Sequence, residues 1–302
     1  MRRQILLAYT HAGFHALLFA LLCAGMTVLG WLSQWAILYG LAAGLGAAYG
    51  GWWLRRWIRL ERALRSPLPQ TWRAVLERIP LYAGMGPDER ERFELLVRLF
   101  LARHRFEGVD GAIPTEERRL LVAAGAAALL FGRPYRGLPH TPTILFYPGP
   151  FDEQFRIHRR GPFWGQVHGQ GPVLLSLPAV ESEWFCRDGQ NLVLHELAHL
   201  LDLDSHGADG IPRDLPPALV RRWRLCLGEI QEAIRKGQSP LRPYAATHPA
   251  ECFAVSVEAF FEIPHTLARA HPQWYALLSE YFQLDPRRWL NAEEEVDPFW
   301  NT

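Results

Sequence analysis

The chain has 302 residues, 49% of them hydrophobic and 21% charged, which is enough for one sizeable folded domain and an accessory segment. Its 32 Lys and Arg against 31 Asp and Glu give a formal net charge of +1, so no overall attraction to nucleic acid is expected. Four cysteines without CxxC spacing do not suggest a disulfide framework.

The N-terminal segment is the most apolar part of the chain. Between Gln4 and Leu54 there is no Asp, Glu, Lys or Arg, whereas one membrane span needs only about 20 residues. The pattern predicts a transmembrane helical hairpin within residues 1–65, with spans at about 8–29 and 35–54. Arginines flank the two outer ends of the hairpin, so the positive-inside bias places both termini in the cytoplasm. We expect a multi-pass protein of the inner (cytoplasmic) membrane.

A cleaved signal peptide is the alternative for this segment. The apolar region of a signal peptide is only about 7 to 15 residues long. The uncharged stretch here is far longer and ends in an arginine cluster that begins at Arg55, which is typical of a stop-transfer flank. The length therefore favours the hairpin.

Residues 66–302 are expected to form one α+β domain. The capping residues and apolar periodicity predict helices at 87–104, 114–131, 217–236 and 272–282. Glycines and prolines bracket short apolar runs that predict strands at 143–147 and 173–177. This combination predicts a small sheet with long loops, packed on helices.

The most informative motif is His195-Glu196-Leu197-Ala198-His199, within an apolar run. On a helix, residues i and i+4 share a face, so His195 and His199 can bind one metal ion. With Glu196 as a general base, this pattern is typical of zinc hydrolases. The alternative is a chance match in which both histidines are ordinary core residues. A third ligand is needed to separate the two interpretations.

Two places in the sequence can be considered for that third ligand, and the first of them is a poor match. A histidine ligand of the metzincin type would stand where this chain has Ser205, and His206 is one residue out of register. The stretch 249–261 predicts a second apolar helix that carries Glu251 and Glu258, which are seven residues apart and therefore on one face. From the residues alone, either glutamate is a candidate.

These motifs resemble those of the Mlc titration factor A (MtfA-like) zinc peptidases. The resemblance is specific in two motifs, Leu194–Asp202 and Tyr244–Val255. It extends to upstream landmarks at Ile79–Leu81, Ile144–Phe151 and Gly171–Ser176, and so covers the chain from Pro69 to Arg288.

The resemblance implies a zincin-like metallopeptidase domain and a set of site residues. By the resemblance, Zn²⁺ is held by His195, His199 and Glu251. Glu196 matches the general base of the family, and Tyr244 matches a tyrosine that faces the metal. The main local departure is His248, where better known members carry Asp.

Three protein ligands leave one tetrahedral position for water, whose pKa zinc lowers to about 7. Glu196 would take the proton of that water and pass it to the leaving amine, and Tyr244 would donate a hydrogen bond to the oxyanion. The sequence therefore predicts a membrane-anchored, cytoplasm-facing zinc metallopeptidase that acts on a peptide or protein substrate. Aminopeptidase and endopeptidase activity are not distinguished by these residues.

The alternative is a regulatory binding protein without catalysis, because the resembled family includes a protein that sequesters a transcription repressor. Two smaller alternatives concern structure. Asp202 either orients a ligand imidazole or is an exposed residue near the helix end. The apolar strand at 172–177 either offers an edge to an extended substrate or is a core strand.

Overall fold

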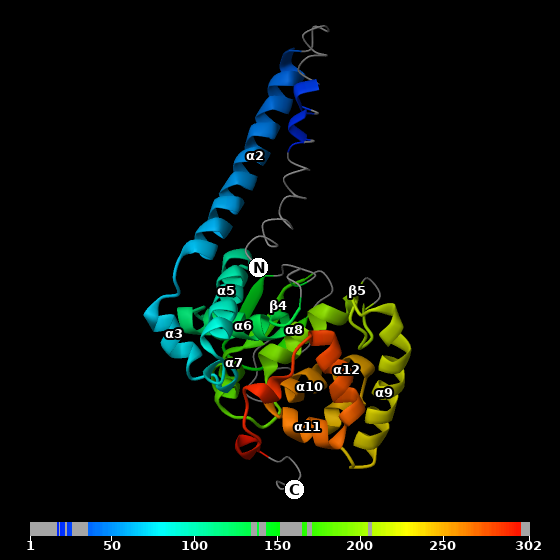
Figure 1. Cartoon of the computed structure of the whole chain (residues 1–302). Helices are drawn as coiled ribbons and strands as arrows, with labels where there is room; N and C mark the ends of the chain where they lie inside the picture. Colours follow the sequence, from blue (N-terminus) through cyan, green and yellow to red (C-terminus); the bar gives the residue numbers. More distant parts are fainter. Residues whose placement is uncertain are drawn as a thin grey trace. The chain divides into compact units, whose positions relative to one another are not determined.

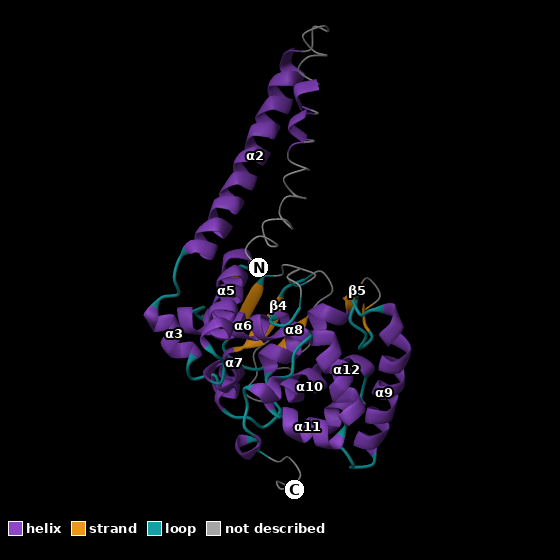
Figure 2. Ribbon diagram, viewed as in Figure 1, coloured by secondary structure: helices purple, strands orange, loops and turns teal. Residues whose placement is uncertain are grey.

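The structure is a computed structural model, and it describes residues 17, 19–21, 23–25, 36–133, 138, 143–151, 165–167, 171–204 and 207–296. The chain forms two compact units, Met1–Pro67 and Leu68–Thr302. Figure 1 follows the chain through both units, and Figure 2 distinguishes helices from strands.

The first unit contains the 30-residue helix α2, Ala36–Arg65. A second helical stretch is described in part between residues 17 and 25. The two stretches are in contact, since the rings of Phe19 and Tyr49 are 5.1 Å apart and a Cβ at Gly46 would be 3.4 Å from Cys23 Sγ.

The structure describes the two predicted membrane spans to different extents. The span at 35–54 falls almost entirely within α2, whereas most of the span at 8–29 lies outside the described residues. In the described part of the chain, no helix combines the length and apolar character needed to cross a membrane. Helix α2 has the length, but glycines, tyrosines and tryptophans interrupt its aliphatic residues, and arginines occupy its C-terminal half.

The second unit is rich in helices, and the predicted elements are present within a few residues of their expected ends. Its α-helices are α3 Gln70–Leu76, α4 Pro80–Ala83, α5 Pro87–Arg103, α6 Glu116–Leu130, α7 Leu177–Ser182, α8 Leu192–Asp202, α9 Pro217–Arg235, α10 Pro249–Glu262, α11 Pro264–Ala270 and α12 Pro272–Phe282. Short 3-10 turns are η1 Glu183–Phe185, η2 Pro243–Ala246, η3 Pro286–Arg288 and η4 Ala292–Glu294.

The described strands form one small mixed sheet and a short hairpin. The sheet consists of β1 Phe106–Gly108, β2 Ile144–Tyr147, β3 Gly165–Val167 and β4 Val173–Ser176. Their order is β1-β2-β4-β3, with β1, β2 and β4 parallel and β3 antiparallel to β4. The hairpin pairs β5 Leu203–Asp204 with β6 Gly207–Ala208.

The hypothesis that residues 172–177 offer a sheet edge to substrate is wrong. Strand β4 pairs with β2 on one side and with β3 on the other, so both rows of its backbone groups are occupied. All four of its residues are buried. Since a strand with two neighbours has no free edge, this segment is a core strand.

Helix α8 packs between helices α6 and α10. Helix α6 is buried from Leu120 to Leu130, and its Gly125 allows close packing against α8, because a Cβ there would lie 2.7 Å from Val193 Cγ1. Helix α10 packs on α8 and on η2 (Figure 1). Helices α8 and α10 thereby bring the two predicted ligand motifs together.

Candidate metal centre

Helix α8 begins after Asn191, which is its N-cap. The side chain of Asn191 accepts a hydrogen bond from Leu194 N (3.1 Å) and donates one to Glu262 Oε1 (3.0 Å), which satisfies one of the free donors at the helix start. Because the helix is regular from Leu192 onward, His195 and His199 lie one turn apart on the same face.

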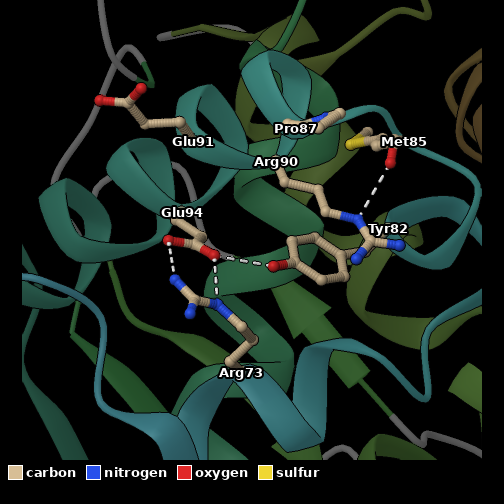
Figure 3. A pocket seen from close by; sticks show the side chains of 7 residues that line it. All are labelled: Arg73, Tyr82, Met85, Pro87, Arg90, Glu91 and Glu94. Carbon is tan, nitrogen blue, oxygen red and sulfur yellow. Dashed lines mark hydrogen bonds and ion pairs between the residues drawn. The ribbon is translucent and has the colours of Figure 1, made fainter.

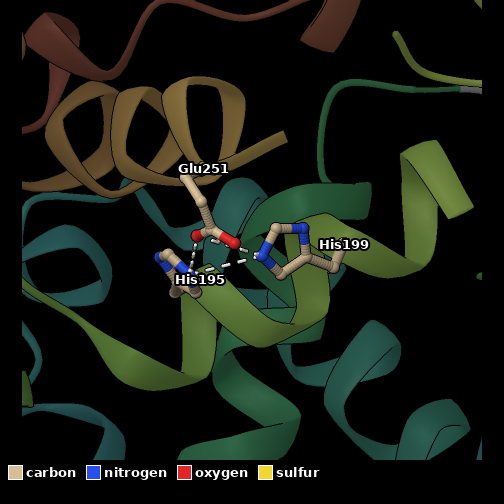
Figure 4. Close-up of side chains that lie close together, drawn as sticks. All are labelled: His195, His199 and Glu251. Atoms are coloured by element: carbon tan, nitrogen blue, oxygen red, sulfur yellow. Dashed lines mark hydrogen bonds and ion pairs between the residues drawn. The ribbon is translucent and has the colours of Figure 1, made fainter. Parts of the chain in front are cut away.

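His195, His199 and Glu251 form a cluster whose ligand atoms all lie within 4.8 Å of one another (Figure 4). The two Nε2 atoms are 3.3 Å apart. Glu251 Oε2, from α10, lies 3.1 Å from His195 Nε2 and 3.6 Å from His199 Nε2. The side chains of His195, His199 and Glu251 are only 8%, 12% and 20% exposed, respectively. The two nitrogens and one oxygen of the cluster are therefore largely shielded from solvent.

These residues fit a metal ion. Glu251 Oε2 is buried and has no hydrogen-bond partner in the described part of the chain, although a buried carboxylate oxygen is costly unless it is bonded. The three atoms converge on one another as ligands of a single cation would. Two imidazoles and one carboxylate are also a common protein ligand set of metal hydrolases.

The pKa values of the three side chains reflect how closely they approach one another. Burial lowers the pKa of His195, but the carboxylates of Glu258 and Glu251 outweigh it and raise that pKa to about 9. The pKa of His199 is raised to about 10 by Asp202 and Glu251, again against burial. Burial raises the pKa of Glu251, yet the two imidazoles hold it well below its usual value. A bound cation would take the place of the protons on the histidines.

Glu258 does not join the cluster but binds the far side of His195. Its side chain is 1% exposed, and its Oε1 lies 2.7 Å from His195 Nδ1. Arg242 donates to both oxygens, at 2.6 and 3.1 Å, and Asn191 N donates to Oε2 at 2.6 Å. A carboxylate on Nδ1 keeps the proton there and leaves Nε2 free to bind the metal.

Asp202 is buried rather than exposed, so the alternative of an exposed residue near the helix end is wrong. Its Oδ2 accepts a hydrogen bond from Gly210 N (2.8 Å), and its Oδ1 lies 3.7 Å from His199 Nδ1. It therefore joins the loop before α9 to the end of α8 and places a negative charge behind the second imidazole.

Glu196 lies between the two histidines and against strand β3. Its side chain is buried. A Cβ at Gly165 would be 2.3 Å from Glu196 Oε1, so only glycine allows the backbone of β3 to pass so close to this carboxylate. Burial raises the pKa of Glu196 to about 6, although the charges of His195 and His199 act against this rise.

Tyr244 lies on η2 and faces the same imidazole. Its ring centroid is 6.1 Å from that of His195, and 48% of the residue is exposed. Burial and the charge of Glu251 raise the pKa of Tyr244 to about 12. Its hydroxyl therefore keeps its proton at neutral pH and remains a hydrogen-bond donor.

His248 is the N-cap of α10 and is not part of the cluster. Its Nδ1 accepts a hydrogen bond from Ala250 N (3.2 Å), the role that Asp commonly fills at this position. The departure from the pattern of the resembled family is therefore accounted for by helix capping.

Sequence reasoning missed Arg242 and Gly165. No motif spacing identifies either residue, because each acts through a partner far away in the chain, Glu258 in one case and Glu196 in the other. The place of Arg242 two residues before Tyr244 was the one available signal.

A separate cavity of about 570 Å³ lies between α3, α4 and α5 (Figure 3). Its buried Glu94 accepts hydrogen bonds from Arg73 Nε (2.9 Å) and from the Tyr82 hydroxyl (2.8 Å). Arg90 donates to Met85 O (2.9 Å) and lies over the Tyr82 ring. These groups bond to one another and join the three helices, which indicates a structural role.

Comparisons with known proteins agree with this centre. Residues 53–283 match the model of the glucose-regulated metallo-peptidase M90 family. The chain is 34% identical over 242 residues to the Mlc titration factor A of Edwardsiella ictaluri, covering 73% of this chain and 90% of the relative. It is 30% identical over 264 residues to that of Escherichia coli O9:H4 (80% and 96%), and 31% identical over 258 residues to an uncharacterized protein of Synechocystis (78% and 92%). The chain therefore belongs to the glucose-regulated metallo-peptidase M90 family.

Proposed function

We propose that this protein is a zinc-dependent metallopeptidase with a zincin-like domain, which hydrolyses peptide bonds with Glu196 as its general base. The observation that carries the proposal is the convergence of His195 Nε2, His199 Nε2 and Glu251 Oε2, with Glu196 beside them. A structural zinc site is more often closed by four protein ligands, whereas three ligands here leave a position for water and substrate.

Zinc is the proposed metal because it prefers imidazole and carboxylate ligands in tetrahedral sites. When bound, zinc lowers the pKa of a coordinated water to about 7 and polarises the peptide carbonyl. His195 is held for this role by Glu258, and Asp202 lies behind His199.

The other residues supply proton transfer and charge stabilisation. Glu196 takes a proton from the attacking water and delivers it to the leaving amine, and its burial against β3 keeps the carboxylate beside the two metal-binding histidines. The protonated hydroxyl of Tyr244 donates a hydrogen bond to the developing oxyanion.

The test is hydrolysis of a panel of chromogenic and internally quenched peptides by the purified full chain. We expect cleavage that a chelator abolishes and that stoichiometric Zn²⁺ restores. Products that lose one residue at a time indicate an aminopeptidase, and internal fragments indicate an endopeptidase. Stoichiometric zinc without cleavage of any peptide contradicts the proposal.

Replacing Tyr244 by Phe is expected to lower kcat about tenfold to a hundredfold with little change in KM, because the hydroxyl acts on the oxyanion and not on the bound peptide. Metal content should stay at the wild-type value. Steady-state kinetics and elemental analysis of the same preparation check this. A rise in KM with unchanged kcat would assign Tyr244 to substrate binding instead.

Replacing Gly165 by Ala is expected to displace the carboxylate of Glu196, since the new Cβ would lie 2.3 Å from its Oε1. Cleavage should fall at least tenfold while zinc remains bound. The matched control is Gly228→Ala, because nothing lies within 4 Å of a Cβ at that position. Equal activities in the two variants would mean that β3 does not constrain the base.

We further propose that the N-terminal 65 residues attach the peptidase domain to the inner (cytoplasmic) membrane, with both termini in the cytoplasm. The uncharged stretch from Gln4 to Leu54 and the arginines that follow it support this proposal. The expected result is that the full chain stays with the membrane fraction after carbonate extraction and that a C-terminal tag is protected in spheroplasts. Release into the supernatant contradicts it.

A second candidate function is the binding of a transcription regulator, because several relatives are named Mlc titration factor A. In that case the biological effect depends on a surface and not on proton transfer. The Glu196→Gln variant would then retain the regulatory effect of the wild type, whereas a peptidase would lose it.

A further inference from the structure

A second cavity of about 420 Å³ lies next to the metal centre. Arg242 and Glu258 line it, and both contact His195 Nδ1, at 3.3 and 2.7 Å. The Nε2 atom of the same ring faces the metal cluster. One imidazole ring therefore separates the cavity from the proposed metal, and exposed Ser182 and Gln190 at its wall leave it open to solvent.

One carboxylate that lines the cavity, that of Glu183, makes no ion pair with a described residue. Both oxygens of Glu258 are used by Arg242, His195 and Asn191, and both terminal nitrogens of Arg242 bind Glu258. Glu183 uses only Oε2, which accepts a hydrogen bond from Leu192 N (2.5 Å), and no described residue bonds its Oε1. Glu258 and Arg242 pair with each other, so the carboxylate of the wall that lacks an ion pair is that of Glu183.

The surroundings of Glu183 favour a cationic ligand. Burial raises the pKa of Glu183 to about 7, and the negative charges of Glu258 and Asp188 add to this rise, whereas Arg242 opposes it only in part. An added cation would stabilise the ionised carboxylate in this partly buried place. Pro178, Ala179 and Leu192 add apolar groups to the wall, which suit the methylene stem of a long basic side chain.

We infer that this cavity is a specificity pocket that receives a lysine or arginine side chain of the peptide, from a residue adjacent to the cleaved bond, and pairs its cation with Glu183. The inference rests on the proposed peptidase function, because the peptide is brought there by the metal centre. Glu183 is thus a specificity-determining residue and takes no part in proton transfer at the scissile bond.

The test measures the binding of peptide hydroxamates to the zinc-loaded full chain by isothermal titration calorimetry. Two pairs of compounds are used, with lysine or its uncharged isostere norleucine on one side or the other of the hydroxamate. We expect the lysine compound of one pair to bind at least tenfold more tightly. In Glu183→Gln, which keeps an oxygen for Leu192 N, this preference should fall below threefold.

The matched control is Glu181→Gln, because Glu181 pairs with Arg118 and does not line the cavity. It should retain the full preference for lysine. If Glu183→Gln does not fold, Ser182→Lys places a cation at the exposed wall and should abolish the preference in the same way. Equal binding of lysine and norleucine by the wild type, a preference that persists in Glu183→Gln, or no hydroxamate binding at all overturns the inference.

This experiment distinguishes a failure of the proposed peptidase function from a failure of the proposed specificity pocket. A lysine preference in binding without hydrolysis of any peptide would contradict the proposed catalysis and leave the pocket standing. Hydrolysis without any preference for a basic residue would contradict the pocket alone.

Discussion

Replacing Glu196 by Gln is expected to lower peptide hydrolysis by about a hundredfold to ten-thousandfold, the usual contribution of a positioned general base. The amide has nearly the same size and fits the same space between β3 and α8, but it cannot take a proton from water. Zinc should remain bound at the wild-type ratio, because the cluster consists of His195, His199 and Glu251. The measurement is kcat/KM on one cleaved peptide, with the metal content of the same sample.

The control for this change is Glu280→Gln, an exposed glutamate on α12. It should have wild-type activity and metal content. Full activity of Glu196→Gln would show that another group carries the proton, and loss of zinc in this variant would mean that Glu196 is itself a ligand.

Replacing Glu258 by Ala is expected to have the largest effect on stability. It removes the shared partner of His195, Arg242 and the Asn191 amide. Breaking a fully buried pair costs about 3 to 5 kcal/mol of the free energy of unfolding, and we expect a somewhat smaller loss here because Arg242 is 30% exposed. Loss of the carboxylate behind a metal-binding histidine lowers metal affinity about tenfold to a hundredfold.

Chemical denaturation of the metal-free protein and competitive zinc titration measure the two effects separately. The matched control is Glu232→Ala, whose exposed pairs with Arg235 and Lys236 are screened by solvent, so this change should leave the free energy of unfolding almost unchanged. If Glu258→Ala binds zinc as tightly as the wild type, the orientation of His195 does not depend on this carboxylate.

The helices and the ligand motifs could be predicted because their signals are local. The i, i+4 histidines are defined within one turn, and Pro249 with the apolar face behind it marks α10. From the residues alone, Glu251 and Glu258 were equivalent. They differ in which side of His195 each one meets, and this depends on the packing of α10 on α8.

The sheet and the supporting residues were harder to predict, for a physical reason. Strand β3 has only three residues, too few for a periodic signal, and so the occupied edge of β4 was not recognised. Arg242 and Gly165 act across the fold, at contacts that no sequence spacing encodes. In the N-terminal segment, the absence of charge predicted two spans. Helix α2 nevertheless contains many glycines and aromatic residues, and no described helix is both long and apolar enough to cross a membrane.

The most direct measurement is the zinc content of the purified full chain, wild type and Glu251→Ala, by elemental analysis, with peptide cleavage by the same samples. We predict about one zinc per wild-type chain together with cleavage, and loss of both in the variant, because Glu251 Oε2 is the one carboxylate oxygen in the cluster. A wild-type chain that binds no zinc under saturating conditions, or a variant that keeps it, would contradict the proposed metal centre.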